Sequence, residues 1–547
     1  SSGIRQWRMR RTAAALALVA LIAASCGGDD TDTTDTTDEV SQTESADSTE
    51  PGGTETPEPS GTGEPSGTGG TGGTVRIGSA LGIPQLDPHR AALIFETTTW
   101  RLLWTALTEF TPEDGAEPQP ALAASWTASD DLMTWTFTLR DGITFSNGDP
   151  ITSEDVKRNV ERVSDPETGF FLQFLFDEVV EVNTPDDQTV EIILASPNSG
   201  LPTVLTRMAV IDLDALDVIN TTPVVSGPYT VSEFVPDDRL VLIPNENYWG
   251  DPAPLDELIY VRAEDTSAAL TSLSAGDLDV LYEPPWQDIA SIDENPDLDV
   301  ITLTEQPPTV MHLMVDSAAP PFDNPSARRA LAHAVDRQTI LDVVYAGRGK
   351  TSPNNSPISV DSEWFADDLP EFEFDLELAK ELFAEAGVNE GDTITYWSTP
   401  AITEFTPVGE VLQANLAEIG IELDIQSVEI GEWVAKFIPV GKSWPNTIIP
   451  NFYTGFPAPL ILELWDGFCE CNYSSEGYAA ALGQGRATLD PAEQMAAYAE
   501  AQRVFTEELP VVTVHHFSVP VAASASVDGI WHEPGGNVQF VDMTTAD

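Results

Sequence analysis

Apolar and polar residues alternate strictly between positions 133 and 140, which predicts a strand with one buried face. Two turns follow, at Asp141-Gly142 and at Asn147-Gly148. Thr152 stands at a helix N-cap position with Asp155 three residues later, an Asp variant of the capping box. The stretch is therefore predicted to run strand, turn, short strand, turn, helix. The apolar positions of the strand are Met133, Trp135, Phe137 and Leu139.

The patterns along the rest of the chain predict an α/β fold. A helix that ends at a glycine and is followed by an alternating strand, as at 408–425, indicates α/β layering. The chain has 547 residues, more than one compact core usually holds, so two or three domains are expected. The other expected helices are 93–107, 266–275 and those starting at Asn324-Pro325 and Asp375, and the other expected strands lie in 179–194, 226–249 and 509–519.

The charge of the chain excludes one class of partner. It contains 90 acidic and 24 basic residues, which gives a formal net charge of −66. Nucleic-acid phosphates are bound by Lys and Arg, so no nucleic-acid partner is expected. The same charge opposes tight binding of the folded part to anionic lipid. With 41% hydrophobic residues, the chain can nevertheless build full-sized cores.

The first 74 residues predict export and a tether. Four arginines precede an apolar run at 12–24, which is too short to span a bilayer and is typical of a signal peptide. Small residues precede Cys26 in a pattern that resembles a bacterial lipoprotein box, so cleavage before Cys26 and lipid attachment to its thiol are expected. A plain secretory signal is the alternative. Residues 27–74 bury too little to offset their ordering entropy, which predicts a disordered linker.

The sequence contains no recognisable catalytic or metal-binding pattern. It has no G-x-S-x-G, no H-E-x-x-H and no G-x-x-x-x-G-K-[ST], so neither enzymatic activity nor a cofactor or metal site is expected. Cys469 and Cys471 form a C-x-C pair whose direct bridge would be strained, which leaves a labile disulfide or two free thiols open. Acidic pairs carry no weight, because a chance pair is expected among 90 acidic residues.

One string carries a specific resemblance. W-x-x-S-x-D followed by T-F-x-L-R-D-G-I-x-F-x-x-G-x-P-x-T-x-E-D-V, within 121–156, closely resembles the signature of the family 5 solute-binding proteins. These are the extracytoplasmic receptors of peptide and nickel ABC importers. The resemblance extends from Val75 to the C-terminus. Further blocks that resemble the family lie at 226–229, 245–250, 273–280, 326–337, 378–387 and 416–421.

This resemblance implies a fold and its boundaries. Members have the periplasmic-binding-protein type II fold, in which a hinge joins two α/β lobes and lobe one carries an extra subdomain. The hinge is made by two crossings of the chain between the lobes. The expected parts are lobe I at 75–308 with its subdomain near 113–225, lobe II at 309–515, a return to lobe I at 516–547, and crossings near 305–310 and 512–520.

The resemblance also places the ligand between the lobes. In peptide-binding members, an Asp in a late aromatic-Gly-Asp-Pro loop pairs with the ammonium of the peptide, because a buried ammonium without a counter-charge is costly. Here Ala458 stands at about that place, which lowers the expectation of simple peptides. Packing inside a lobe is the open alternative for the aromatic candidates. The candidate ligand contacts are Phe452, Tyr453, Thr454, Gly455, Phe456, Trp397, Trp286, Asn472 and Asp87.

These expectations combine into one function. The chain is expected to be the substrate-binding component of an ABC importer, a monomer held outside the cytoplasmic membrane by a lipid on Cys26. It would capture a peptide or peptide-like solute and deliver it to the permease and ATPase subunits. Binding would favour the closed form, because only a shut cleft lets the ligand contact both lobes. The alternatives are a sensory or interaction lipoprotein, a receptor for an opine-like, glycan-derived or metal-chelate solute, and a secreted hydrolase.

Overall fold

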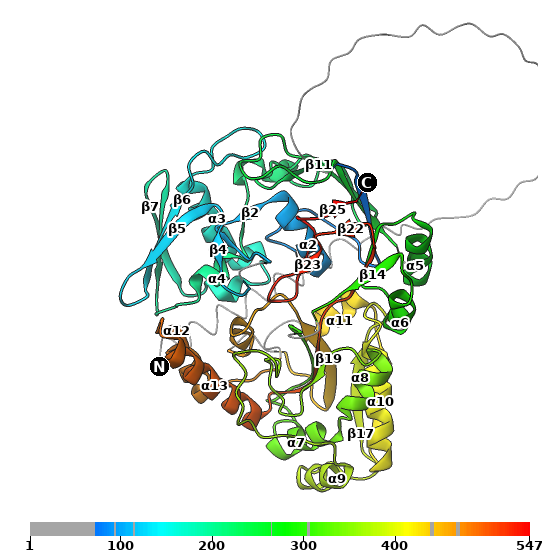
Figure 1. Ribbon diagram of the computed structural model, residues 1–547. Coiled ribbons are helices and arrows are strands. Elements are labelled where there is room, and N and C mark those ends of the chain that lie inside the picture. The colour runs from blue at the N-terminus through cyan, green and yellow to red at the C-terminus, as the bar shows by residue number, and fades with distance from the viewer. Residues whose placement is uncertain are drawn as a thin grey trace, which may run out of the picture.

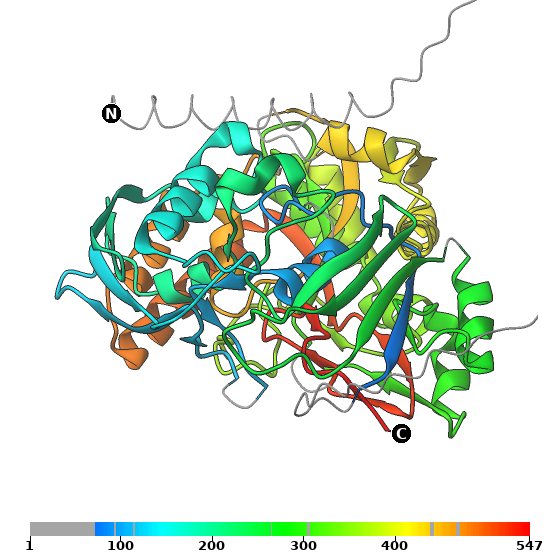
Figure 2. The ribbon, with the colours of Figure 1, turned by 90° about the horizontal axis from the view of Figure 1, so that it is seen from above.

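Two large β-sheets, one in each lobe, organise the protein (Figure 1). The four-stranded sheet within residues 123–194 and the two helices within residues 266–293 lie at opposite ends of the first lobe in both ribbon views (Figure 2). This two-lobed α/β arrangement agrees with the architecture expected from the sequence. The computed structural model describes residues 72–91, 94–112, 115–263, 265–303, 307–437, 442–466 and 471–546.

The first lobe is built on a seven-stranded sheet of order β10-β11-β12-β1-β13-β21-β14. Strand β1 pairs in parallel with β12 and β13, and the other pairs are antiparallel. The strands are β1 Thr74–Ser79, β10 Tyr229–Val235, β11 Arg239–Pro244, β12 Glu257–Arg262, β13 Val280–Tyr282, β14 Leu298–Ile301 and β21 Val521–Ser524. The helices are α2 Ile94–Leu103, α4 Leu201–Leu205, α5 Thr266–Ala275 and α6 Ile289–Asp293.

The stretch at 121–156 contributes two strands to a separate four-stranded sheet of order β5-β6-β8-β7. The predicted strand is β6, and its alternate side chains Trp135, Phe137 and Leu139 are buried. The predicted capping box is confirmed, because the Asp155 carboxylate accepts the backbone N–H of Thr152 at 2.8 Å. The elements are β5 Ala123–Ala128, β6 Thr134–Leu139, β7 Val179–Asp186, β8 Thr189–Leu194 and the helix α3 Ser153–Ser164.

The second lobe is built on a six-stranded sheet of order β16-β20-β15-β19-β17-β18. Every residue of its central strands β15 and β20 is buried. The strands are β15 Thr309–Val315, β16 Lys350–Thr351, β17 Thr393–Ser398, β18 Glu422–Ser427, β19 Thr447–Tyr453 and β20 Val511–Phe517. The helices are α7 Pro325–Ala334, α8 Arg337–Val344, α9 Leu376–Glu385, α10 Phe405–Glu418, α11 Ile430–Phe437, α12 Glu476–Arg486 and α13 Pro491–Glu508.

The helix predicted at 93–107 is too long. It ends at Leu103, because Thr105 joins a two-stranded sheet with Val210 and its N–H donates to the Ser226 hydroxyl at 2.9 Å. The short sheets pair β2 Thr105–Ala106 with β9 Ala209–Val210, β3 Thr108–Glu109 with β4 Gln119–Pro120, β22 Val527–Asp528 with β25 Thr544–Thr545, and β23 Trp531–His532 with β24 Val538–Gln539.

The chain passes twice between the two large sheets. It leaves the first sheet after β14 and enters the second at β15, and it returns between β20 and β21. The strand predicted at 509–519 therefore stays in the second sheet, and β21 makes the return. The backbone N–H of Leu303 donates to the Ser518 hydroxyl at 3.0 Å, so the two crossings are joined to each other.

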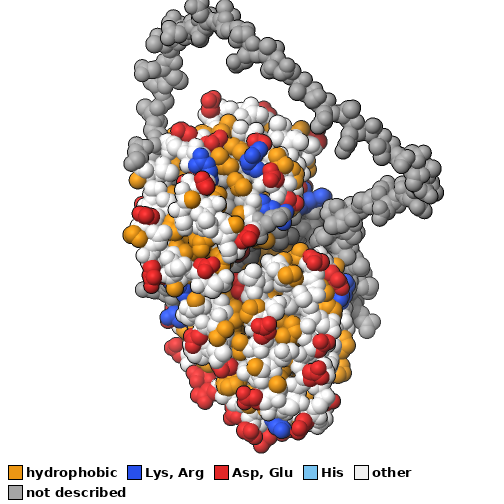
Figure 3. Space-filling view, turned by 90° about the vertical axis from the view of Figure 1, so that its right-hand side faces the viewer, with side chains coloured by type: hydrophobic (Ala, Val, Ile, Leu, Met, Phe, Trp, Pro, Cys, Tyr) orange, Lys and Arg blue, Asp and Glu red, His pale blue; other side chains and the backbone are white. Residues whose placement is uncertain are grey.

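The predicted signal peptide, the linker and Cys26 lie outside the described residues. Within the described ranges, no helix is both long and apolar enough to cross a membrane. Acidic side chains are spread over the face of the molecule shown in Figure 3, and few basic ones lie among them. This distribution agrees with the negative net charge of the chain.

Candidate functional site

The loop after β19 lies at a seam between the two lobes. Gly455 adopts a left-handed conformation with φ of +86°, and its N–H donates to the Gly535 carbonyl at 2.5 Å. The Thr454 hydroxyl also donates to this carbonyl, at 3.2 Å. Gly535 belongs to the turn between β23 and β24, and β24 packs against helix α2 of the first lobe. The predicted loop therefore holds the lobes together through its backbone.

Two cavities lie on either side of this seam. The larger has a volume of about 640 Å³ and is lined by residues of the first crossing, of the second lobe and of the C-terminal segment, among them Leu303, Trp364, Ala458 and Trp531. The smaller, of about 100 Å³, lies between first-lobe residues such as Trp100 and the loop 454–456. Phe456 lines both cavities. The seam is thus the place where a solute between the lobes would touch both.

A buried charge cluster anchors the turn that carries Gly535. The Glu533 carboxylate is 1% exposed and accepts hydrogen bonds from Arg101 and, at 2.7 Å, from Arg207. Burial raises the pKa of Glu533, but the charges of Arg207 and Arg101 outweigh this effect and hold the pKa below its ordinary value. This cluster therefore fixes the first-lobe side of the seam.

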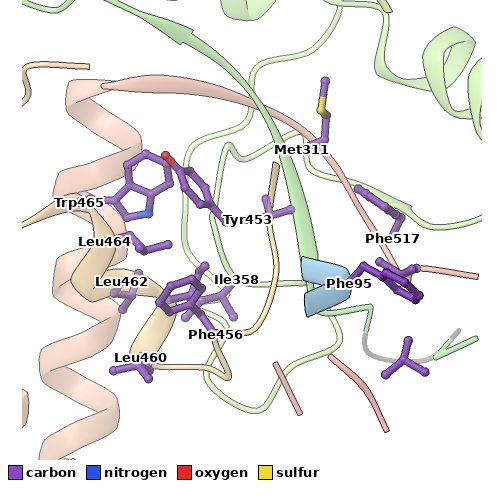
Figure 4. Close-up of a cluster of buried hydrophobic side chains, with 14 of the residues drawn as sticks. Phe95, Met311, Ile358, Tyr453, Phe456, Leu460, Leu462, Leu464, Trp465 and Phe517 are labelled. Atoms are coloured by element: carbon purple, nitrogen blue, oxygen red, sulfur yellow. The ribbon is translucent and has the colours of Figure 1, made fainter. Parts of the chain in front are cut away.

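Tyr453, by contrast, packs inside the second lobe. Its ring lies 5.5 Å from the ring of Trp465 and 6.0 Å from that of His312, and its hydroxyl contacts the sulfur of Met314. Figure 4 shows the Tyr453 and Trp465 rings side by side, with Phe456 next to Ile358. Tyr453 is only 5% exposed and lines neither cavity described above.

Replacing Tyr453 with phenylalanine is expected to leave solute affinity unchanged and to lower the unfolding free energy by about 1 kcal/mol, the usual contribution of one hydroxyl contact. The ring keeps its packing, and only the hydroxyl inside the lobe is lost. Urea unfolding and a solute titration on the same preparation measure the two effects. A fall in affinity at unchanged stability would instead put the hydroxyl in the cleft.

The remaining aromatic candidates occupy different surroundings. Phe452 is half-buried, and its ring lies against Phe405 and Phe517. Trp397 is covered on one face by Lys436, whose ammonium lies 3.7 Å from the ring centre. Trp286 follows β13 of the first lobe and reaches the second, where its indole N–H donates to Glu404 at 2.6 Å. Of these three, Trp286 is the residue that bridges the lobes.

Asn472 and Asp87 are engaged within single lobes. The side-chain amide of Asn472 donates to Asp316 at 3.0 Å and to the Lys442 carbonyl at 2.8 Å. The Asp87 carboxylate accepts two hydrogen bonds from Arg162, at 2.9 and 2.5 Å. Its pKa is lowered, because the hydrogen bonds and charge of Arg162 outweigh the effect of burial. Both residues therefore hold loops in place, and neither lines the two cavities described above.

Two acidic residues near Trp286 carry no signal in the sequence. Glu283 follows β13, and Glu404 precedes α10. Burial, and then the charge of Glu404, raise the pKa of Glu283 to about 8, so the two carboxylates lie within each other's field. Sequence reasoning missed them, because 121 residues separate them and acidic residues are abundant throughout the chain.

Within the described ranges, no group of three or more His, Cys, Asp or Glu side chains is arranged to hold a metal ion. Cys471 is disulfide-bonded, and the other two cysteines of the chain, Cys26 and Cys469, lie outside the described residues. His515 and His516 are fully buried in β20 and belong to the core of the second lobe.

Comparison with known proteins agrees with this architecture. Relatives include the glutathione-binding protein GsiB of Salmonella typhi, 27% identical over 490 residues, which cover 86% of this chain and 93% of the relative. GsiB of Escherichia coli O1:K1 / APEC is 28% identical over 443 residues, covering 77% of this chain and 85% of the relative.

Solved structures share the fold. The dipeptide-binding protein of Pseudoalteromonas sp. SM9913 in complex with Met-Leu superposes with a TM-score of 0.77 at 21% identity, covering 87% of this chain and 100% of that chain. The agropinic acid complex of AgaA from A. tumefacien R10 superposes with a TM-score of 0.75 at 23% identity, covering 86% and 99%.

The sequence model of one family decides the assignment. The model described as "Bacterial extracellular solute-binding proteins, family 5 Middle" matches residues 117–443, which is more than half of the chain. Members of this family are substrate-binding proteins rather than enzymes. The resemblance of the string at 121–156 is therefore confirmed, and the chain belongs to the family 5 bacterial extracellular solute-binding proteins.

Proposed function

We propose that this protein captures a peptide or peptide-like solute between its lobes and delivers it to the permease of an ABC importer, without turnover of the solute. The observation that carries the proposal is the 640 Å³ cavity, because its lining comes from a crossing, from the second lobe and from the C-terminal segment. A solute there would be enclosed only when the lobes are shut. The permease would then recognise the shut form.

The lobe boundaries belong to this proposal. Lobe I comprises 75–308, with a subdomain at 113–225, and lobe II comprises 309–515, before the C-terminal return at 516–547. Residues 302–303, 307–308 and 518–520 lie between the two large sheets, which supports a hinge at these two crossings. The protein acts as a monomer outside the cytoplasmic membrane, with permease and ATPase subunits as its partners.

The solute class rests on two observations. The named relatives bind glutathione, and the compared structures hold the dipeptide Met-Leu or agropinic acid. Ala458 lines the larger cavity at the place where peptide-binding members carry an Asp, so that position offers no counter-charge to an ammonium. An opine-like solute is therefore the second candidate.

Native mass spectrometry of the purified protein tests the proposal. Mild desolvation keeps a co-purified solute bound, and the excess mass identifies it. A peptide or modified peptide supports the proposed function, and an opine-like mass supports the second candidate. Turnover of the bound solute during incubation would overturn the receptor role in favour of an enzyme.

Replacing Cys26 with alanine is expected to release the protein from the membrane, because this thiol is the proposed lipid attachment point. The wild-type protein should take up radiolabelled palmitate and sediment with membranes, whereas the variant should do neither. A single acyl chain alone binds membranes marginally, so the fraction released by a high-salt wash is measured for both proteins. A variant that stays in the membrane fraction would contradict the lipid anchor.

A further inference from the structure

Glu283 and Glu404 approach each other across the two lobes. Glu283 belongs to the first lobe, and its backbone N–H donates to the carbonyl of Pro520 in the second crossing at 3.1 Å. Glu404 stands at the start of α10 in the second lobe and accepts the indole N–H of Trp286. Each side chain is half-buried, so solvent-sized groups still reach it. Trp286 therefore brings the carboxylates of the two lobes to the same place in the interface between them.

Neither carboxylate has a cation of this protein beside it. In the part of the chain that the structure describes, no Lys or Arg forms an ion pair with Glu283 or Glu404. Two half-buried carboxylates that repel each other are costly, and burial raises the pKa of both. Glu283 also adopts a left-handed conformation, with φ of +54°, which is strained for a non-glycine residue. At neutral pH this cost is avoided by protonation of Glu283, whose pKa is about 8, whereas a positive charge from outside the chain would favour the ionised form of both carboxyl groups.

Two further polar side chains, packed next to Trp286, have no hydrogen-bond partner. The hydroxyl of Tyr345, which is fully buried, makes no hydrogen bond, and neither ring nitrogen of the fully buried His515 makes one. The Tyr345 ring lies 5.1 Å from Trp286 and 4.0 Å from His515. After burial, the charge of Glu404 is the next cause that raises the pKa of Tyr345, so its hydroxyl lies within reach of that charge. A buried hydroxyl without a partner is a group that a ligand satisfies.

Aromatic rings surround Trp286 next to the two carboxylates. Trp286 packs edge-on against Tyr345 and, at 5.8 Å, against Phe517. Aromatic faces attract ammonium and guanidinium groups, and nearby carboxylates strengthen that attraction. Carboxylates from both lobes, an unpartnered hydroxyl and aromatic walls are together the chemistry that recognises an organic cation.

We propose that Glu283 and Glu404, with Trp286 and Tyr345, form a site for a positively charged ammonium or guanidinium group of the solute. This inference rests on the proposed function and specifies its substrate class. The cation would neutralise the repulsion between the two carboxylates and so favour the closed form. It would also supply the counter-charge that Ala458 cannot provide. The positive group is either the terminal ammonium of a peptide or the side chain of a basic residue.

Four tripeptide probes distinguish a terminal ammonium from a side-chain ammonium as the positive group that is bound. Ala-Ala-Ala carries a terminal ammonium, and its N-acetylated form does not. N-acetyl-Ala-Lys-Ala carries only a side-chain ammonium, and N-acetyl-Ala-norleucine-Ala is its neutral counterpart of similar shape. Affinities are measured by calorimetry on the wild-type protein and on Glu283→Gln and Glu404→Gln. Glutamine at position 404 still accepts the Trp286 N–H, and Glu294→Gln removes an exposed first-lobe charge as the matched control.

The expected result is a preference of at least tenfold for one cationic probe over its neutral counterpart. Each of the two Gln variants should reduce this preference at least tenfold, with neutral probes bound as before, and Glu294→Gln should preserve it. Equal affinity for cationic and neutral probes, unchanged in the variants, overturns the cation site and leaves peptide binding intact. If no probe binds, the peptide function fails, and the co-purified solute decides: a cationic solute lost from Glu404→Gln supports the site. A neutral solute, an anionic solute or none overturns it.

Discussion

Replacing Glu533 with glutamine is expected to lower the free energy of unfolding by about 3–5 kcal/mol, the usual effect of removing one partner of a buried ion pair. Glu533 pairs with Arg101 and Arg207, whose side chains are 9% and 4% exposed. Arg101 retains Glu109, but Arg207 keeps a buried charge beside the ring of Phe110 without its carboxylate. Urea unfolding followed by tryptophan fluorescence measures the loss.

The control for this variant is Asp214→Asn. Asp214 pairs with Arg158 through two hydrogen bonds, but this pair lies at the surface, where water screens it. Its loss should change stability very little. Equal effects of the two substitutions would show that the Glu533 cluster adds no stability beyond that of a surface pair.

The contribution of Glu533 also depends on pH in a defined direction. Its pKa in the folded protein is lower than the ordinary value of 4.5 that it takes on unfolding. The stabilisation is therefore fully present above pH 4.5 and is lost as the pH falls through the lowered folded-state value. The stability difference between wild type and Glu533→Gln should shrink in that acidic range.

Replacing Gly535 with alanine is expected to weaken solute binding about 5- to 150-fold, which corresponds to the 1–3 kcal/mol of a typical overpacking. A Cβ at this position would lie 2.5 Å from the carbonyl carbon of Gly455 and 2.7 Å from the nitrogen of Phe456. Both are backbone atoms, so no side-chain rotation relieves the contact. The lobes would have to separate at the seam, which disfavours the closed form.

Calorimetry with the co-purified solute and small-angle X-ray scattering measure this effect. With solute present, the variant should have a larger radius of gyration than the wild type. Gly483→Ala is the matched control, because Gly483 lies in helix α12 and a Cβ there meets no atom within 4 Å. It should bind normally and gain about 0.5–1 kcal/mol of stability. Unchanged affinity and unchanged dimensions of Gly535→Ala would contradict closure at this seam.

Local sequence patterns predicted several helices and strands of this protein. The period-two run became β6, the Thr152–Asp155 capping box starts α3, and Asn324 caps α7 as expected. These features depend on residues within one or two turns of each other, so a sequence displays them directly. The helix predicted at 93–107 was too long, because residues 105–106 pair instead with the distant short strand at Ala209–Val210.

The candidate site was predicted less well, because the contacts of its side chains are made with residues that are distant in the sequence. The loop 454–456 was singled out by alignment of one motif, and the structure places it at the seam between the lobes. Nothing in the string distinguishes Tyr453, which packs on Trp465, from Phe456, which lines both cavities. Tyr453 ends β19 and Phe456 lies in the loop that follows, and only the packing of the folded chain decides which ring meets the core and which meets the cavities.

By itself, the sequence determined the family, the α/β class and the positions of several elements, because these follow from local periodicity, helix caps and a long ordered motif. Tertiary structure alone decided which residues meet across the lobes. Glu283 and Glu404 become partners only when the chain crosses between the sheets, and Glu533 becomes a buried counter-ion only when its turn reaches Arg101 and Arg207. Charge interactions act through space, so their strength depends on distance and burial, which the order of residues does not state.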